Sequence, residues 1–229
     1  MKCSTTISFQ PSFISKMELS TELEKYIQTH SSTEEPLLNH IYRQTNLNMV
    51  NPRMVSGHIQ GLFLSLLSQL MQPSNILEIG TYTGYSAICL AKGLTQEGKL
   101  HTIEVNDEIA EFAKGNIRSA LMDHCVVQHI GNALEIVPSL AATFDIIFID
   151  GEKREYPDYF MICKDRLRNG GLLLADNVLW NGKVVDINAQ NESATKAVME
   201  FNKMVQNDKS FENVLLPIRD GIMMARKIL

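Results

Sequence analysis

Several common sequence features are absent, and each absence narrows the class of protein. None of the four cysteines forms a Cys-x-x-Cys pair, which disfavours a disulfide framework and indicates free thiols in a reducing compartment. Positive charge is not in excess, because 21 Lys and Arg stand against 26 Asp and Glu, and this disfavours a dedicated nucleic-acid-binding protein. No apolar run approaches the roughly 20 residues of a membrane span, and the N-terminal segment has no apolar core of a signal peptide. We therefore expect a cytoplasmic protein without a membrane segment.

The composition that is present is typical of a globular protein. Of the 229 residues, 45% are hydrophobic and 21% are charged, which is close to average usage, and a chain of this length suggests one domain. The first helical pattern begins at Met17. We therefore expect a single domain over residues 17–229 and a flexible N-terminal extension over residues 1–16.

Segments with a helical period alternate with short apolar runs that are typical of buried strands. The expected strands are residues 75–79, 100–105, 125–130, 144–149, 170–175, 214–217 and 222–226. The expected helices are residues 18–29, 36–44, 56–69, 109–120, 133–142, 156–167 and 193–207, with a further helical pattern through residue 91. The third helix is expected to carry one apolar face made of Ile59, Leu62, Phe63, Leu66, Leu67 and Leu70.

This alternation predicts an α/β fold in which helices cover both faces of a mostly parallel sheet, with extra helices at the N-terminus. Five strands are expected to be parallel. Only four residues, 218–221, separate the last two strands. Because a parallel crossover needs a dozen residues or more, these two strands are expected to form an antiparallel hairpin.

The turns after the first three strands have the composition of a nucleoside-binding slot. The loop Gly80-Thr-Tyr-Thr-Gly84 differs from Gly-x-Gly-x-x-Gly, because Tyr82 and Tyr85 stand where the dinucleotide motif needs its second and third glycines. This favours a cofactor without a pyrophosphate. Glu104, at the end of the second strand, is placed to accept hydrogen bonds from both ribose hydroxyls. The small residues at 131–133 leave room for a flat base.

Oxygen-bearing side chains follow the fourth and fifth strands. Asp150 ends one strand, and Asp176 and Asn177 end the next. Because adjacent parallel strands lie about 4.8 Å apart, we expect these three side chains to converge. Two carboxylates and an amide suit a hard divalent cation such as Mg²⁺, Mn²⁺ or Ca²⁺. Lys153 follows closely and is either a general base or a solvated cation.

Three segments, residues 77–86, 144–153 and 174–183, together resemble the cation-dependent O-methyltransferases of the caffeoyl-CoA and catechol type. The most specific part is Asp-Asn-Val-Leu-Trp-Asn-Gly at residues 176–182. The resemblance runs from about Glu18 to the C-terminus. It implies a Rossmann-like sheet of seven strands with an antiparallel last strand, S-adenosylmethionine as the methyl donor, and a homodimer.

The resemblance also implies roles for individual residues by motif position. It matches Asp150, Asp176 and Asn177 to metal ligands, Lys153 and Asp150 to the catalytic residues, and Asn181 to a substrate contact. The sequence departs from the family pattern at Gly151-Glu152, where Ala-Asp is usual. The implied cofactor contacts are Val55, Glu78, Gly80, Thr81, Ser86, Glu104, Ala133, Asp150 and Glu152.

We therefore expect a divalent-metal-dependent O-methyltransferase that acts on a small phenolic substrate with two vicinal hydroxyls. One alternative is the same chemistry on a hydroxylated nucleoside in tRNA, which would need a basic surface. A second alternative is a nicotinamide-dependent oxidoreductase, which would leave Asp150, Asp176 and Asn177 without a role. The acceptor specificity is expected to lie in the N-terminal helices and in the loop at residues 180–191.

Overall fold

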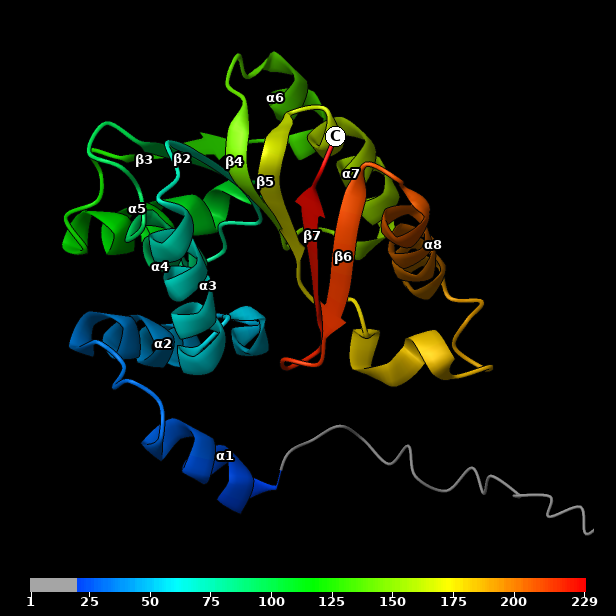
Figure 1. The fold of residues 1–229 in the computed structure, drawn as a ribbon. Helices are drawn as coiled ribbons and strands as arrows, with labels where there is room; N and C mark the ends of the chain where they lie inside the picture. Colours follow the sequence, from blue (N-terminus) through cyan, green and yellow to red (C-terminus); the bar gives the residue numbers. More distant parts are fainter. Residues whose placement is uncertain (1–19) are drawn as a thin grey trace, which may run out of the picture.

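The computed structural model describes residues 20–229, and these residues form one sheet of seven strands (Figure 1). The expected extension over residues 1–16 lies outside the described residues, so the boundary at residue 17 stays a prediction. The strand order is β3-β2-β1-β4-β5-β7-β6. The strands are β1 (Asn75–Ile79), β2 (Lys99–Glu104), β3 (Val126–Ile130), β4 (Phe144–Ile149), β5 (Leu167–Ala175), β6 (Phe211–Leu216) and β7 (Ile222–Lys227).

The direction of the strands agrees with the predicted fold class. Strand β1 pairs in parallel with both β2 and β4, and β5 pairs in parallel with β4. Only β7 runs antiparallel to its neighbours β5 and β6. The chain proceeds outward from β1 to β3 and then returns to β4 on the other side of β1. Ligands bind at such a reversal of strand order, outside the carboxyl ends of the strands.

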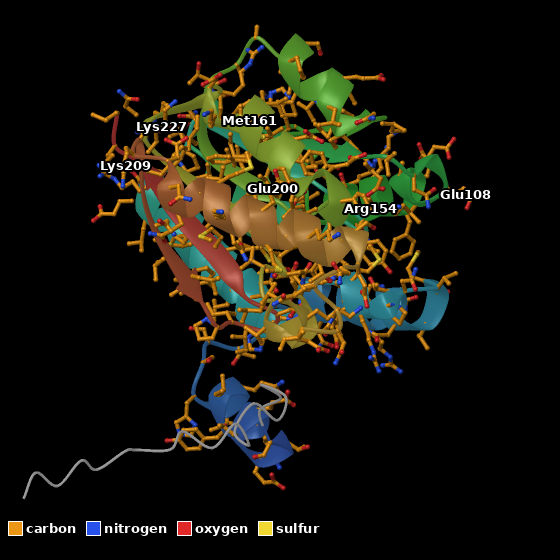
Figure 2. All side chains as sticks on the ribbon, turned by 90° about the vertical axis from the view of Figure 1, so that its right-hand side faces the viewer. Glu108, Arg154, Met161, Glu200, Lys209 and Lys227 are labelled. Carbon is orange, nitrogen blue, oxygen red and sulfur yellow. The ribbon has the colours of Figure 1, made fainter. Side chains whose placement is uncertain are left out.

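Helices cover both faces of the sheet (Figures 1 and 2). The apolar residues of β4 alternate between two cores: Ile147 and Ile149 pack toward α6, α7 and α8, whereas Ile146 and Phe148 pack toward α3, α4 and α5. A strand that is buried on both faces therefore carries a continuous apolar run. The helices are α1 (Thr21–Thr29), α2 (Pro36–Asn48), α3 (His58–Met71), α4 (Tyr85–Ala91), α5 (Asp107–Ser119), α6 (Ala133–Ser139), α7 (Tyr156–Lys164) and α8 (Ser193–Asn207), with short 3₁₀ helices η1 (Pro52–Met54), η2 (Lys153–Glu155) and η3 (Trp180–Val185).

Some element boundaries agree with the prediction and others differ by up to four residues: α2 extends to Asn48, and β5 and β6 each begin three residues earlier than expected. Helix α8 and strands β1 and β4 have the predicted bounds. The helix expected at residues 156–167 ends at Lys164, because Leu167 already pairs with Phe144 as the first residue of β5. The helix expected at residues 133–142 ends three residues early, since Pro138 in its last turn has no N–H group to continue the helix.

The predicted apolar face of α3 is wrong in part. The helix buries Gln60, Gly61, Leu64, Ser65 and Ser68, whereas the expected core residues Leu66 and Leu70 are 52% and 82% exposed. The physical reason is a close approach to α4. A Cβ atom added to Gly61 would lie 2.6 Å from the Tyr85 ring, so the small residues of α3 must face that helix.

Helix α1 lies apart from the rest of the described chain in both views (Figures 1 and 2). None of its residues is buried. Within residues 20–229, no helix is long and apolar enough to cross a membrane.

Candidate active site

The loop after β1 brings the ends of three strands together. Gly80 has φ 102°, and a Cβ atom there would lie 2.2 Å from the backbone oxygen of Asp150. Only glycine fits this backbone conformation and this approach. Ile79 accepts a hydrogen bond from the N–H of Asp150 at 2.8 Å, and Ile103 of β2 accepts one from the N–H of Gly80 at 2.9 Å. The loop is therefore fixed to both neighbouring strands.

The carboxylate of Glu104 is oriented at the end of β2. It accepts hydrogen bonds from the N–H groups of Tyr82 (2.7 Å) and Asn106 (2.9 Å), one on each oxygen. A carboxylate oxygen has a further acceptor position beyond one such bond. Glu104 can therefore bind the two hydroxyls of a ribose while the protein holds it in place.

Glu78 is a fully buried acid with one oxygen lacking a partner. Its Oε2 accepts a hydrogen bond from the Thr102 hydroxyl at 2.5 Å, and Thr102 also shares a 2.6 Å hydrogen bond with Thr81. Its Oε1 is buried and has no hydrogen-bond partner among residues 20–229. Burial raises the pKa of Glu78 to about 8, and the nearby hydroxyl groups of Ser86 and Thr102 oppose this rise. A buried unpartnered oxygen is costly in a native protein, which points to a ligand that bears a donor group.

The two acidic residues predicted as metal ligands lie side by side. Ile149 of β4 is in register with Ala175 of β5, so the next residues, Asp150 and Asp176, end adjacent strands. Asp176 is 3% exposed. Burial raises the pKa of Asp150 to about 6; Lys153 lowers it, and the negative charge of Asp176 raises it further.

The residue types at this point fit a hard cation. Asn177 follows Asp176 directly in a left-handed conformation with φ 59°. No group of three or more His, Cys, Asp or Glu residues with metal-binding geometry occurs within the described part of the chain. The candidate site therefore consists of two carboxylates and one amide oxygen, and oxygen ligands of this kind bind Mg²⁺ or Ca²⁺ rather than Zn²⁺.

Lys153 is held next to this pair of carboxylates. Its Nζ atom donates to Oδ1 of Asp150 (2.9 Å), to the backbone oxygen of Gly151 (3.1 Å) and to the hydroxyl of Tyr156 (2.7 Å). The buried Tyr156 hydroxyl in turn donates to the backbone oxygen of Asp176 at 2.9 Å. The side chain of Lys153 is thus held in place by three hydrogen bonds, and it is not the solvated cation that the sequence left open as an alternative.

The remaining predicted site residues have different surroundings. Val55 and Ala133 are buried, the first after η1 and the second at the start of α6. The Glu152 side chain is 47% exposed and accepts a hydrogen bond from Arg154 at 2.9 Å. Asn181 is exposed, and its backbone N–H donates to Oδ1 of Asp220 at 2.5 Å. The structure therefore brings together the residues around Asp150, whereas Glu152 is engaged with Arg154.

Sequence reasoning missed two polar residues that contact this site. Gln60 donates to Oδ2 of Asp176 at 2.7 Å, and Arg219 donates to Oε1 of Gln60 at 3.0 Å. Gln60 stands among apolar residues of a helix, which is a weak signal of a buried polar contact. Nothing local predicts that Arg219 lies near it, since 159 residues separate the two.

The sheet order, the reversed β7 and the ligand-binding edge define a Rossmann-like methyltransferase fold. One solved structure with this fold is the O-methyltransferase TomG from Streptomyces achromogenes, in complex with SAM. It is similar with a TM-score of 0.84 at 30% identity, over 91% of this chain and 96% of that chain.

The O-methyltransferase family model matches residues 28–228, and the chain belongs to this family. A catechol O-methyltransferase from Niastella koreensis is 40% identical over 161 residues, which are 69% of this chain and 72% of that protein. A caffeoyl-CoA O-methyltransferase from Medicago sativa is 32% identical over 186 residues, 76% of this chain and 75% of that protein. The expected S-adenosylmethionine-dependent O-methyltransferase is thereby confirmed, and the nicotinamide-dependent alternative loses its support.

The buried carboxyl of Glu78 generates a prediction about pH and stability. Its pKa is about 8 in the folded protein against 4.5 as the ordinary value, so the folded state retains this proton while the unfolded state loses it. Stability should therefore fall as the pH rises from about 4.5 to 8. Glu78→Gln removes this contribution. The difference in free energy of unfolding, variant minus wild type, should therefore increase from pH 4.5 to pH 8 by on the order of a few kcal/mol.

Urea unfolding at pH 5 and pH 8 measures this difference. Glu200→Gln is the matched control, because Glu200 is an exposed acid on α8 (Figure 2). A pH dependence of Glu78→Gln that runs parallel to that of wild type would show that Glu78 is ionised in the folded protein.

Proposed function

We propose that the protein transfers a methyl group from S-adenosylmethionine to one hydroxyl of a small catechol-like acceptor, with the help of a divalent cation. The observation that carries this proposal is the pair of neighbouring carboxylates, the partly buried Asp150 and the buried Asp176, next to the positioned amine of Lys153. The Niastella relative named catechol O-methyltransferase supports the class of acceptor. Mg²⁺ is the first candidate for the cation, with Mn²⁺ and Ca²⁺ as alternatives.

The cofactor slot is assigned to the carboxyl ends of β1 and β2. Glu104 would accept hydrogen bonds from the ribose hydroxyls, and the unpartnered Oε1 of Glu78 would face a donor group of the cofactor. Gly80 lets the loop after β1 lie directly against the backbone of Asp150, so the proposed cofactor slot borders the proposed cation site. S-adenosylmethionine supplies a methyl group on a positively charged sulfur. The other proposed contacts are Val55, Thr81, Ser86, Ala133, Asp150 and Glu152.

The acceptor hydroxyl must lose its proton as the methyl group arrives. The C–S bond breaks, an O–C bond forms, and the hydroxyl proton passes to a base, so the products are the methyl ether and S-adenosylhomocysteine. A phenol has a pKa near 10, as for tyrosine, so little of it is ionised at neutral pH. Asp150, Asp176 and Asn177 would hold a divalent cation, and such a cation would lower the pKa of a hydroxyl bound to it.

Lys153 is proposed as the base that takes this proton. Its amine can do so only from the neutral form. The Tyr156 hydroxyl and the backbone oxygen of Gly151 accept hydrogen bonds from the amine. These two contacts would hold it in place while the Asp150 carboxylate binds the proposed cation. Asn181, on the exposed loop after Asn177, is proposed to contact the acceptor.

Binding of S-adenosylmethionine should depend on Glu104 and not on metal. Glu104→Ala removes two hydrogen bonds to a charged group, so the affinity should fall by roughly 30- to 700-fold, which corresponds to about 2–4 kcal/mol. Isothermal titration calorimetry in EDTA measures the affinity. Glu108→Ala, at an exposed acid on α5, is the matched control, and an unchanged affinity of Glu104→Ala would remove the ribose assignment.

Activity should depend on a divalent cation and on two adjacent hydroxyls. EDTA should abolish methylation of a catechol, and Mg²⁺ or Mn²⁺ should restore it. Isolated monophenols should react far more slowly, because one oxygen gains no fixed approach to the methyl group. Asp176→Ala should lose activity while its unfolding transition remains cooperative.

The same assay includes undermethylated tRNA as an acceptor, which tests the nucleoside alternative directly. Full activity in EDTA, or equal rates on catechols and monophenols, would contradict the role of the cation. Preference for tRNA over every catechol would contradict the proposed acceptor class.

We also propose that the protein is a homodimer in which a second copy covers the outer face of α3. Leu66 and Leu70 lie one helical turn apart on that face and are 52% and 82% exposed. Light scattering after gel filtration should give twice the chain mass for wild type and the chain mass for Leu66→Glu/Leu70→Glu. Leu121→Glu, at an exposed leucine after α5, should remain dimeric; a monomeric wild type or a dimeric double variant would exclude this interface.

The cytoplasmic location stays a prediction.

A further inference from the structure

The hairpin between β6 and β7 reaches across the ligand-binding edge of the sheet to the segment that precedes α3. The guanidinium group of Arg219 donates to the backbone oxygens of Val55 (3.0 Å) and Arg53 (3.3 Å) and also to that of Ser56. The same group donates to the side-chain oxygen of Gln60 at 3.0 Å. One side chain of the hairpin thus binds four acceptors in residues 53–60.

Gln60 connects this arginine to Asp176. The glutamine side chain is fully buried in α3. Its Nε2 donates to Oδ2 of Asp176 at 2.7 Å, while its Oε1 accepts from Arg219. Since the guanidinium has only donors, it fixes which end of the amide is the acceptor, and the amide nitrogen must then face the carboxylate. Without Arg219 the amide could rotate and place its oxygen against Asp176.

The carboxylate of Asp176 is consequently held from two sides. Its Oδ1 accepts from the N–H of Asn177 at 2.7 Å, and its Oδ2 accepts from Gln60. Each oxygen retains a further acceptor position, and the two bonds fix the rotation of the group. Hydrogen bonds that orient a ligating carboxylate in this way contribute strongly to metal affinity.

The same hairpin also holds the loop that follows Asn177. Asp220, next to Arg219, accepts from the N–H groups of Leu179 (2.9 Å, on its backbone oxygen) and Asn181 (on its side chain). The two neighbouring residues of the hairpin therefore contact the cofactor segment around Val55 on one side and the proposed acceptor loop on the other.

We propose that Gln60 and Arg219 are positioning residues of the methyl-transfer site: Gln60 orients the carboxylate of Asp176 toward the cation, and Arg219 orients the amide of Gln60. This inference rests on the proposed metal site at Asp150, Asp176 and Asn177. Neither residue contacts the reacting atoms in this account. Arg219 additionally joins the metal site to the segment that contains Val55.

The proposal makes a specific statement about two affinities. Gln60→Met keeps the size of the side chain and removes both hydrogen bonds, so Mn²⁺ affinity should fall roughly 10- to 100-fold. The affinity for S-adenosylmethionine in EDTA should stay as in wild type. Arg219→Met should weaken Mn²⁺ binding to a smaller extent, and Arg219→Lys, which keeps a donor for Gln60, should recover part of that loss. The effect of Arg219→Met on Mn²⁺ should vanish in the Gln60→Met background, because the arginine acts through the glutamine.

Electron paramagnetic resonance of free Mn²⁺ in titrations of the full chain measures these affinities without turnover. Gln69→Met is the matched control, because Gln69 lies on the same helix and its amide bonds only to Ser65. Undiminished Mn²⁺ affinity in Gln60→Met, or equal losses from Arg219→Met with and without Gln60, would overturn the proposal. Should Gln60→Met fail to unfold cooperatively, Arg219→Met decides alone, since its side chain is at the surface: undiminished Mn²⁺ affinity in Arg219→Met would then overturn the proposal.

Mn²⁺ binding by Asp176→Asn distinguishes a failure of the proposed metal site from a failure of the positioning role of Gln60 and Arg219. Wild-type binding that disappears in Asp176→Asn but persists in Gln60→Met keeps the metal site and removes the positioning role. Wild-type binding that is unchanged in Asp176→Asn removes the metal site itself, and the positioning role with it.

Discussion

The burial of two carboxylates at the ends of adjacent strands is the constraint on which the site depends. Parallel pairing of β4 with β5 places Asp150 beside Asp176; Asp176 is buried, and the Asp150 side chain is only 17% exposed. Two negative charges in such a place repel each other and lose hydration, and they are stable only with compensating positive charge or hydrogen-bond donors. The donors in the structure are Lys153 on Asp150, and Gln60 and the backbone N–H of Asn177 on Asp176. A divalent cation between the carboxylates would supply the largest compensation, and the proposed chemistry needs it at this place.

The rest of the fold brings donors and ligand-binding loops to this pair. The reversal of strand order between β1 and β4 lets the backbone of Gly80 approach Asp150, which joins the proposed cofactor loop to the proposed metal site. The antiparallel β7 turns the chain so that its hairpin returns to the same edge of the sheet. Arg219 and Asp220 then contact elements from opposite ends of the sequence. One edge of the sheet thus holds the proposed cofactor, cation and acceptor contacts close together.

The parts of this arrangement that depend on local sequence could be predicted. The apolar run of β4 and the acids that follow each strand lie within short segments, and strand register converts their spacing along the chain into a site. The face of α3 could not be predicted from periodicity, because small residues such as Gly61 and Ser65 allow a closer approach to α4 than the leucines do. The bond between Arg219 and Gln60 depends on the return of the last hairpin, and no local pattern reports a contact over such a separation. Glu152 was expected at the cofactor, and its partner in the structure is Arg154.

The central claim is that Asp150, Asp176 and Asn177 together bind one divalent cation. The most direct measurement is anomalous X-ray diffraction from crystals of the full chain grown with Mn²⁺. The account predicts one strong anomalous peak per chain, with oxygens of all three residues about 2.0–2.6 Å away, in the range of hard cations. A peak that lies elsewhere, or no peak at an Mn²⁺ concentration that supports activity, would contradict it.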